Sequence, residues 1–243
     1  ENYSLKKKLF TSVPGMVIVS VSKWLDNLVS ESFFKRSKHI VIYNGVDVNI
    51  FKPQEVNETI RSKYKLIGKH IMLGVASTWE PRKGLKDYIS LSKLLSEDEI
   101  IILIGLSQKQ INDLPENIIG LSRTENKQEL VDLYNISDVY INLSVEETFG
   151  LTTAEALACG TPVIVYNSTA CPELVDTKTG MVITKNDIYS VYNAVSKIIE
   201  NGKSSYSDKC RQRVLDNFDE KKKYTKYLET YESLIKEFQT NII

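Results

Sequence analysis

The chain has 243 residues, of which 42% are hydrophobic and 26% are charged, and its 31 basic side chains balance 31 acidic ones. This length and apolar content suffice for one large or two small folded domains and exclude a disordered chain. A net charge of zero, with both signs mixed along the sequence, provides no broad field to attract a polyanion, so we expect no nucleic-acid partner.

Short apolar runs rich in β-branched residues alternate with amphipathic stretches along most of the chain. The runs predict buried strands of a parallel sheet, and the stretches between them predict covering helices. Strands are expected at Met16 to Val21, His39 to Tyr43, Ile71 to Ala76, Ile100 to Gly105, Asn117 to Leu121, Val139 to Leu143, Pro162 to Tyr166 and Met181 to Ile183. Helices are expected at Lys23 to Phe34, Gly84 to Leu95, Ser107 to Leu114, Lys127 to Ile136, Leu151 to Cys159, Asp187 to Asn201, Ser207 to Asn217 and Glu220 to Phe238. The pattern therefore predicts an α/β fold with a doubly wound parallel sheet.

A polar stretch with turn-forming residues separates the first two strands from the rest. It begins at Asn44-Gly45-Val46-Asp47, contains Pro53 and continues to about Ser62. The βα units before it are too few to bury a core, so residues 1–48 are expected to be the trailing βα unit of a truncated domain. Residues 49–218 would form the main domain, and 219–243 a final helix. The missing initial Met agrees with a truncated chain.

Cysteine content, hydropathy and missing motifs exclude several classes of protein. Three cysteines, Cys159, Cys171 and Cys210, fit neither an even disulfide set nor the spacing of a zinc site. No apolar run approaches the roughly 18 residues of a membrane span, and no signal peptide precedes the first strand. The cysteine usage therefore predicts a cytoplasmic protein. GxSxG, P-loop and GxGxxG motifs are absent, which argues against a triad hydrolase, a P-loop NTPase and a dinucleotide dehydrogenase, and no DxD motif is present, so we expect no metal.

Two glutamates flank a turn after the strand at Val139 to Leu143. Glu147 lies eight residues before Glu155, and a helix begins between them, near Leu151. The first amides of a helix suit a phosphate, and a carboxylate one turn inside could accept hydrogen bonds from ribose hydroxyls. Either glutamate alone fits better as a surface residue beside an ordinary helix, but the joint pattern favours a sugar-nucleotide site. The diphosphate would lie at Gly150, Leu151 and Thr152.

A basic loop follows the strand at Ile71 to Ala76. Arg82 and Lys83 precede a glycine and a helix, at the carboxyl edge of the predicted sheet, where open α/β folds bind ligands. Lys83 would act as a point charge on a diphosphate, and Arg82 could fork onto a phosphate or neutralise a leaving group. The alternative is that both are solvated loop charges.

In order along the chain, these motifs resemble the C-terminal half of the family-4 glycosyltransferases. These are retaining enzymes of GT-B architecture that move a sugar from a nucleotide donor to an acceptor. Glu147 to Glu155 stand as the E-x7-E signature, Trp79 to Leu85 as the basic loop, and Cys171 to Gly180 as the segment beyond the signature. The resemblance extends from about Val19 to Ile183. Ser77 stands where the family often carries an arginine, which leaves open whether Arg82 replaces that cation.

The resemblance implies a role for each candidate residue. Glu147 would orient the transferred sugar, while Lys83 and Arg82 stabilise the departing diphosphate. Glu155 would hold the ribose, and main-chain groups at Ser122 would meet the base. No protein nucleophile, metal ion or other cofactor is implied, since the nucleotide-diphosphate sugar is a substrate.

The expected function is sugar transfer in glycan or polysaccharide biosynthesis, with this chain as the donor-binding half. The acceptor would be a saccharide or a lipid-linked molecule, and peripheral membrane association would come through the missing N-terminal domain. Because that domain holds the acceptor site, we expect poor transfer by the chain alone. The alternatives are a non-catalytic nucleotide-sugar-binding subunit that needs a partner chain and a GT-B epimerase.

Overall fold

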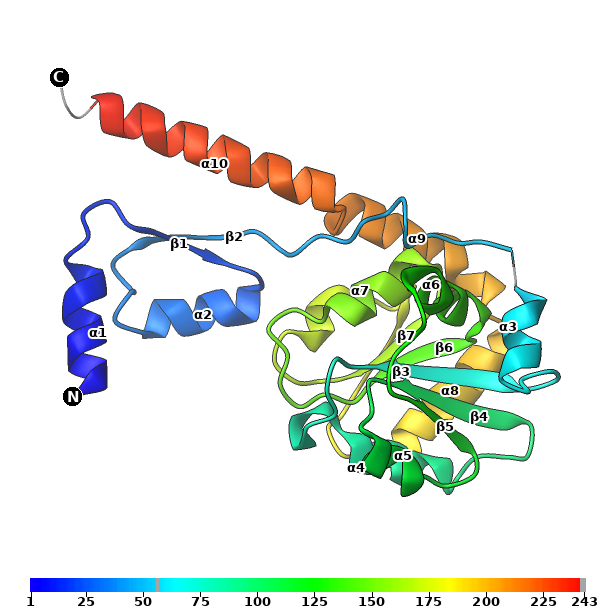
Figure 1. Ribbon diagram of the computed structural model, residues 1–243. Helices are drawn as coiled ribbons and strands as arrows, with labels where there is room; N and C mark the ends of the chain where they lie inside the picture. Colours follow the sequence, from blue (N-terminus) through cyan, green and yellow to red (C-terminus); the bar gives the residue numbers. More distant parts are fainter. Residues whose placement is uncertain (56, 241–243) are drawn as a thin grey trace.

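The computed structural model describes residues 1–55 and 57–240 and contains two sheets of parallel strands (Figure 1). The larger sheet has six strands with helices on both faces, and the smaller one has two. This arrangement confirms the expected α/β class with a doubly wound parallel sheet. The strands are β1 (Val17–Ser20), β2 (Lys38–Val41), β3 (His70–Val75), β4 (Glu99–Ile104), β5 (Ile118–Leu121), β6 (Val139–Asn142), β7 (Val163–Tyr166) and β8 (Gly180–Ile183).

Every helix expected from the sequence has a counterpart, with ends that differ by a few residues. The sequence pattern does not predict α1 or α3. No residue of α1 is buried, and three consecutive lysines interrupt its apolar residues; α3 has six residues, fewer than two turns. The helices are α1 (Asn2–Thr11), α2 (Lys23–Glu31), α3 (Glu58–Lys63), α4 (Leu85–Ser92), α5 (Gln108–Asn112), α6 (Lys127–Ile136), α7 (Leu151–Ala158), α8 (Ile188–Asn201), α9 (Ser204–Asn217) and α10 (Glu220–Thr240), with 3₁₀ turns η1 (Pro81–Lys83) and η2 (Cys171–Leu174).

The order of the six strands places the loops that matter for the site. The order is β5-β4-β3-β6-β7-β8, so the chain winds outward from β3 on one side and from β6 on the other. Leu73 of β3 pairs with Ile102 of β4 and with Tyr140 of β6. Open α/β sheets bind ligands where the winding direction reverses, beyond the carboxyl ends of the strands. The loops that follow β3 and β6 are therefore neighbours at this switch point.

Neighbouring residues of the central strands enter two separate cores. Met72 and Leu73 are both fully buried, but they belong to different hydrophobic clusters because successive side chains of a strand point to opposite faces. Leu73 packs in the cluster that contains residues of α6, α7 and α9, and Met72 packs in the one that contains residues of α4 and α8. Burying a side chain of this size contributes about 1.5–3 kcal/mol. Burial on both faces fixes the sheet from which the site loops extend.

The N-terminal residues form a small unit in which α2 connects β1 to the parallel strand β2. The chain then passes the start of α10, where the Val46 amide donates to the Phe218 carbonyl (2.8 Å). Gly45 allows this approach, because a Cβ there would lie 2.2 Å from Cα of Glu220. Farther along α10, Glu237 pairs with Lys38 of β2 (2.9 Å). The expected division at residues 48 and 218 stays a prediction.

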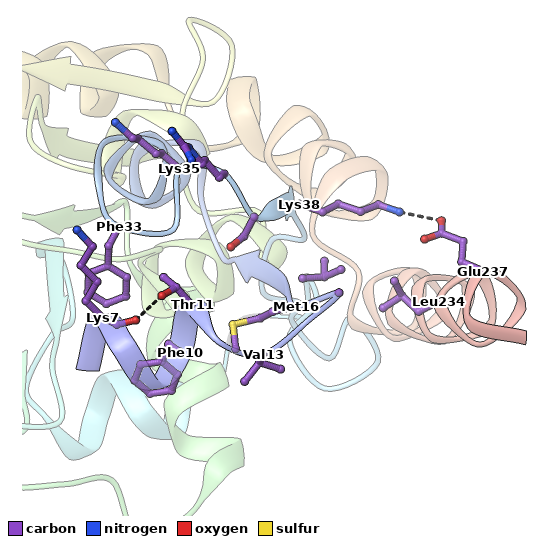
Figure 2. A pocket seen from close by; sticks show the side chains of 14 residues that line it. Lys7, Phe10, Thr11, Val13, Met16, Phe33, Lys35, Lys38, Leu234 and Glu237 are labelled. Carbon is purple, nitrogen blue, oxygen red and sulfur yellow. Dashed lines mark hydrogen bonds and ion pairs between the residues drawn. The ribbon is translucent and has the colours of Figure 1, made fainter. Parts of the chain in front are cut away.

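An open pocket of about 800 Å³ lies in this N-terminal region, between α1, the smaller sheet and α10 (Figure 2). Basic and aromatic side chains both contribute to its lining, among them Lys7, Phe10, Phe33, Lys35, Arg36 and Lys38. It is bordered by residues from outside the six-stranded sheet, so it is separate from the site that the motifs predict.

Candidate functional site

The loops after β3 and β6 are joined by their backbones. The amide of Val145 donates to the carbonyl of Arg82 (2.9 Å). Gly84 packs directly against the end of β6, where a Cβ would lie 2.4 Å from the Leu143 carbonyl oxygen. Its φ of +78° also belongs to the left-handed region that favours glycine. Glycine at this position thus brings the basic loop over the carboxyl end of β6.

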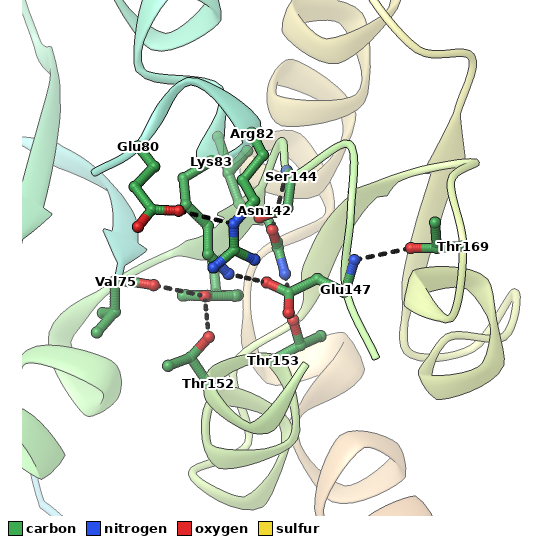
Figure 3. Close-up of polar contacts among 12 residues, drawn as sticks. Val75, Glu80, Arg82, Lys83, Asn142, Ser144, Glu147, Thr152, Thr153 and Thr169 are labelled. Atoms are coloured by element: carbon green, nitrogen blue, oxygen red, sulfur yellow. Dashed lines mark hydrogen bonds and ion pairs between the residues drawn. The ribbon is translucent and has the colours of Figure 1, made fainter. Parts of the chain in front are cut away.

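Lys83 and Glu147 form an ion pair at this junction (Figure 3). Nζ of Lys83 donates to Oε1 of Glu147, and the two side chains are only 17% and 14% exposed. Shielding from water strengthens their attraction relative to a surface ion pair. The structure therefore brings together two predicted site residues that are 64 positions apart in the sequence.

Arg82 lies at the rim of the same junction. Its side chain is 45% exposed, and its Nε donates to Oε2 of Glu80 (2.8 Å). This hydrogen bond raises the pKa of Arg82 above its ordinary value, with smaller contributions from the charges of Glu147 and Glu146. Arg82 is thus a cation near the Lys83–Glu147 pair, held by Glu80.

The N-terminus of α7 lies beside this pair (Figure 3). Gly150 precedes the helix with a φ of +97° and, as a glycine, provides no side chain to cap the first amides. Leu151 is exposed, and the hydroxyl of Thr152 accepts a hydrogen bond from Tyr140 (2.7 Å). An uncapped helix start carries unpaired amides and the positive end of the helix dipole, so it suits an anion.

Glu155 lies about one turn inside α7 and is mostly buried. The hydroxyl of Tyr134, on α6, donates to its Oε2 over 2.9 Å. Burial raises the pKa of Glu155 to about 7, although the hydrogen bond from Tyr134 and the charge of Lys127 oppose this rise. Glu155 is therefore a carboxyl group that titrates near neutral pH.

Ser122 is the one predicted site residue that the described structure leaves apart from the others. It is exposed and follows β5, the edge strand, which is separated from β3 by β4. At about 4.8 Å per strand spacing, its strand lies roughly 10 Å from β3. Its predicted contact with a base stays a prediction.

Two further residues support the site, and only one of them has a signal in the sequence. Asn142 is a buried polar residue at the end of an apolar strand, which is such a signal. Its Nδ2 donates to Oγ1 of Thr153, and its Oδ1 accepts from the Ser144 amide, both at 3.0 Å. Thr169, in the loop after β7, accepts a hydrogen bond from the Glu147 amide (2.8 Å). No spacing or composition indicates that contact.

The described residues form neither a metal cluster nor a membrane-spanning helix. Within residues 1–55 and 57–240, no group of three or more His, Cys, Asp or Glu side chains could hold a metal ion. Cys159, Cys171 and Cys210 are free and buried, and burial raises the pKa of each thiol to about 12. None of the helices in the described part of the chain has both the length and the apolarity to cross a membrane. The expected cytoplasmic location and the expected lack of a metal stay predictions.

Known proteins resemble this chain in sequence and in structure. The family model described as "Glycosyl transferases group 1" matches residues 56–214. An uncharacterized glycosyltransferase of Methanocaldococcus jannaschii is 24% identical over 229 residues, which cover 90% of this chain and 58% of that protein. The MMP alpha-(1->4)-mannosyltransferase of Mycolicibacterium hassiacum is 23% identical over 244 residues, covering 95% and 57%. The chain thus spans less than two thirds of the length of these relatives.

A solved structure shares the fold. The crystal structure of Anabaena HepE in complex with UDP and glucose superposes with a TM-score of 0.79 at 20% identity, covering 96% of this chain and 67% of that one. This similarity confirms the expected Rossmann-like fold of GT-B proteins.

Proposed function

The chain belongs to the group 1 glycosyl transferases, and from this premise we propose that it takes part in sugar transfer from a nucleotide-diphosphate sugar to an acceptor. In this proposal the six-stranded unit binds the donor, and the reaction is of the retaining, family-4 type that the motifs predict. The acceptor is a saccharide or a lipid-linked molecule. The observation that carries the proposal is the meeting of Lys83 and Glu147 beside the uncapped start of α7.

The diphosphate would bind between the start of α7 and the basic loop. The amides of Leu151 and Thr152 would donate to its oxygens, as helix N-termini do in other phosphate sites. Lys83 has three N–H donors, so it can hold Glu147 with one and a phosphate oxygen with another. Arg82 would add a second positive charge from the rim. These charges would stabilise the diphosphate as it departs.

The two glutamates would bind the sugars on either side of the diphosphate. A carboxylate offers about four acceptor positions, so Glu147 can keep Lys83 and also accept from hydroxyls of the transferred sugar. Glu155 would accept from the ribose, and the main chain at Ser122 would meet the base. Such contacts would hold the anomeric carbon in place while its bond to the phosphate oxygen breaks and the electron pair stays on the diphosphate. The acceptor hydroxyl would form the new bond to this carbon, and its proton would pass to the departing phosphate oxygen.

The named proteins support a nucleotide-sugar donor. Anabaena HepE was crystallised with UDP and glucose, and the Mycolicibacterium relative is named a mannosyltransferase. We therefore propose that the donor of this chain is a hexose linked to a nucleoside diphosphate.

Calorimetric titration with UDP-glucose, GDP-mannose and ADP-glucose tests the donor site. At least one should bind, and Glu155→Ala should bind it about 10- to 100-fold more weakly, because a hydrogen bond to a charged group contributes about 1.5–3 kcal/mol. Glu116→Ala is a matched control, because Glu116 is exposed in the turn before β5. No binding by the unaltered chain, or equal binding by both variants, would contradict the proposed donor site.

A second candidate is a non-catalytic nucleotide-sugar-binding subunit that needs a partner chain. The chain spans 58% and 57% of the two relatives described above, and in the expected architecture the acceptor binds to the other domain. An assay with a radiolabelled donor sugar tests the second candidate. Label in an oligosaccharide or lipid fraction supports transfer and contradicts the subunit, whereas donor binding without transfer is what both candidates predict for this chain alone.

A further inference from the structure

Thr169 has an unusual backbone conformation beside the candidate site. It lies in the loop between β7 and η2, and its φ of +48° falls in the left-handed region. A β-branched residue is rarely found there, because its Cβ substituents crowd the backbone. Such strain persists only where the surrounding structure imposes it, and it is concentrated at functional sites.

The surrounding loop holds Thr169 in this conformation. The Ser168 amide donates to the Tyr166 carbonyl (2.8 Å), and the Cys171 amide donates to the Ser168 carbonyl (3.1 Å). The next residue, Ala170, is fully buried. The position of residue 169 is therefore determined by its neighbours, and glycine would satisfy the same backbone with less strain.

Threonine adds to this turn a hydroxyl that reaches Glu147. Oγ1 of Thr169 accepts from the amide of Glu147 over 2.8 Å (Figure 3), and the amide of Ala170 donates to the carbonyl of Glu147 over 3.3 Å. Both backbone groups of Glu147 are thus bound by the loop after β7. Its carboxylate is bound on the other side by Lys83. The loop after β7 and the basic loop together fix Glu147.

We propose that Thr169 is a positioning residue for Glu147. The hydroxyl of Thr169 orients that glutamate toward the sugar of the donor. This inference rests on the proposed function, because it assumes that Glu147 contacts the transferred sugar. Strain at residue 169 is the consequence of placing a hydroxyl in a turn that suits glycine. The hydroxyl should therefore govern recognition of the sugar, and the strain should govern only stability.

Three substitutions separate the hydroxyl from the strain. Thr169→Ser keeps the hydroxyl, Thr169→Val keeps the β-branched shape without it, and Thr169→Gly removes both. We expect the serine variant to bind the nucleotide sugar as tightly as the unaltered chain. The valine and glycine variants should both bind it about 2- to 10-fold more weakly, the range for loss of one neutral hydrogen bond. The thermal midpoint of the glycine variant should nevertheless be higher than that of the valine variant, because glycine relieves the strain at residue 169.

Comparing two ligands shows whether the substitutions weaken contacts to the sugar or to the nucleotide. The affinity for the best binder among UDP-glucose, GDP-mannose and ADP-glucose should fall, while that for the corresponding nucleoside diphosphate should not change, because Glu147 would contact only the sugar. If the affinities for the nucleotide sugar and for the nucleoside diphosphate fall together, Thr169 is merely structural and the inference is wrong. The same conclusion follows if the affinities of the valine and glycine variants differ in parallel with their stabilities.

Two controls complete the design. Lys65→Gly relieves another left-handed residue (φ +56°), which is exposed and follows α3, so it should change stability without changing either affinity. Amide hydrogen exchange at Glu147 should be faster in the valine and glycine variants than in the serine variant, which tests the contact without a ligand. If the unaltered chain binds none of the nucleotide sugars, the proposed function fails; if it binds one and the variants bind it equally, only the inference fails.

Discussion

The hydroxyl of Tyr134 donates a hydrogen bond to Oε2 of Glu155 over 2.9 Å, within the core that lies under α6 and α7. Tyr134 is fully buried, and burial raises the pKa of Glu155 to about 7 in spite of this hydrogen bond. A residue expected to bind a ribose is therefore partly protonated at neutral pH. This has consequences for both stability and donor binding.

Glu155 should make the stability of the chain depend on pH. Because its pKa is higher in the folded chain than the ordinary value of about 4.5, the folded chain binds more protons, and the free energy of unfolding should fall as pH rises from about 4.5 to about 7. Glu155→Gln should lack this part of the fall, about 1–3 kcal/mol. Urea unfolding of both chains across this range measures the difference, and parallel profiles would contradict the assignment.

The same titration should affect the donor. If ribose hydroxyls donate to the ionised carboxylate, a proton must leave Glu155 before the donor binds, so affinity should rise between pH 6 and 8. A nucleotide-diphosphate sugar suits this test because it has no terminal phosphate of the kind that titrates near pH 6. Calorimetry at pH 6, 7 and 8 should show a slope that is lost in Glu155→Gln.

Substitutions of Lys83 and Glu147 should have coupled effects on the free energy of unfolding, because the two side chains form an ion pair. Removing either partner leaves a mostly buried charge without its partner, whereas removing both does not. We expect Lys83→Met and Glu147→Gln to be destabilising, and the double variant to be more stable than the sum predicts by about 1–3 kcal/mol. The exposed pair Lys38 and Glu237 is a matched control and should give little coupling. Additive effects at Lys83 and Glu147 would show that the pair contributes nothing.

The sequence predicts which loops form this site, but not all of the contacts within it. Continuous apolar runs such as Ile100 to Gly105 identify buried parallel strands, and a parallel sheet places the loops after its strands at one edge. That reasoning suffices to bring Lys83, after β3, near Glu147, after β6. It needs the strand positions, a doubly wound strand order that makes β3 and β6 neighbours, and the rule that ligands bind at the switch point.

The remaining features depend on contacts between side chains that no local pattern encodes. The bond from Tyr134 to Glu155 spans 21 positions, and the bond from Glu147 to Thr169 spans 22. Each requires the relative placement of two elements to within about 1 Å, which residue type and spacing do not determine. The pKa of Glu155 likewise depends on its burial, which the position of this residue one turn inside a helix does not reveal.

Glu173 should hold the small N-terminal unit against the six-stranded one. Its carboxylate accepts from the amides of Lys23 (2.9 Å) and Trp24 (2.8 Å) at the start of α2, and from the hydroxyl of Tyr43 (2.8 Å). A negative charge there also stabilises the helix dipole. We expect Glu173→Ala to speed hydrogen exchange at both amides, whereas Tyr43→Phe should leave them protected because it removes only the third contact. Unchanged exchange in Glu173→Ala would mean that α2 is held by other groups.

Gly84 should tolerate no side chain, for two reasons that a matched control can separate. Its φ is +78°, and a Cβ would lie 2.4 Å from the carbonyl oxygen of Leu143. Gly68 has a similar φ of +73°, but its Cβ would meet nothing within 4 Å. Gly68→Ala should therefore cost only the left-handed backbone, about 1–2 kcal/mol. Gly84→Ala must also push the basic loop away from β6, so we expect it to cost more and to weaken binding of the nucleotide sugar by displacing Lys83. Equal loss of stability in the two variants, measured by urea unfolding, would show that the basic loop does not depend on this close approach.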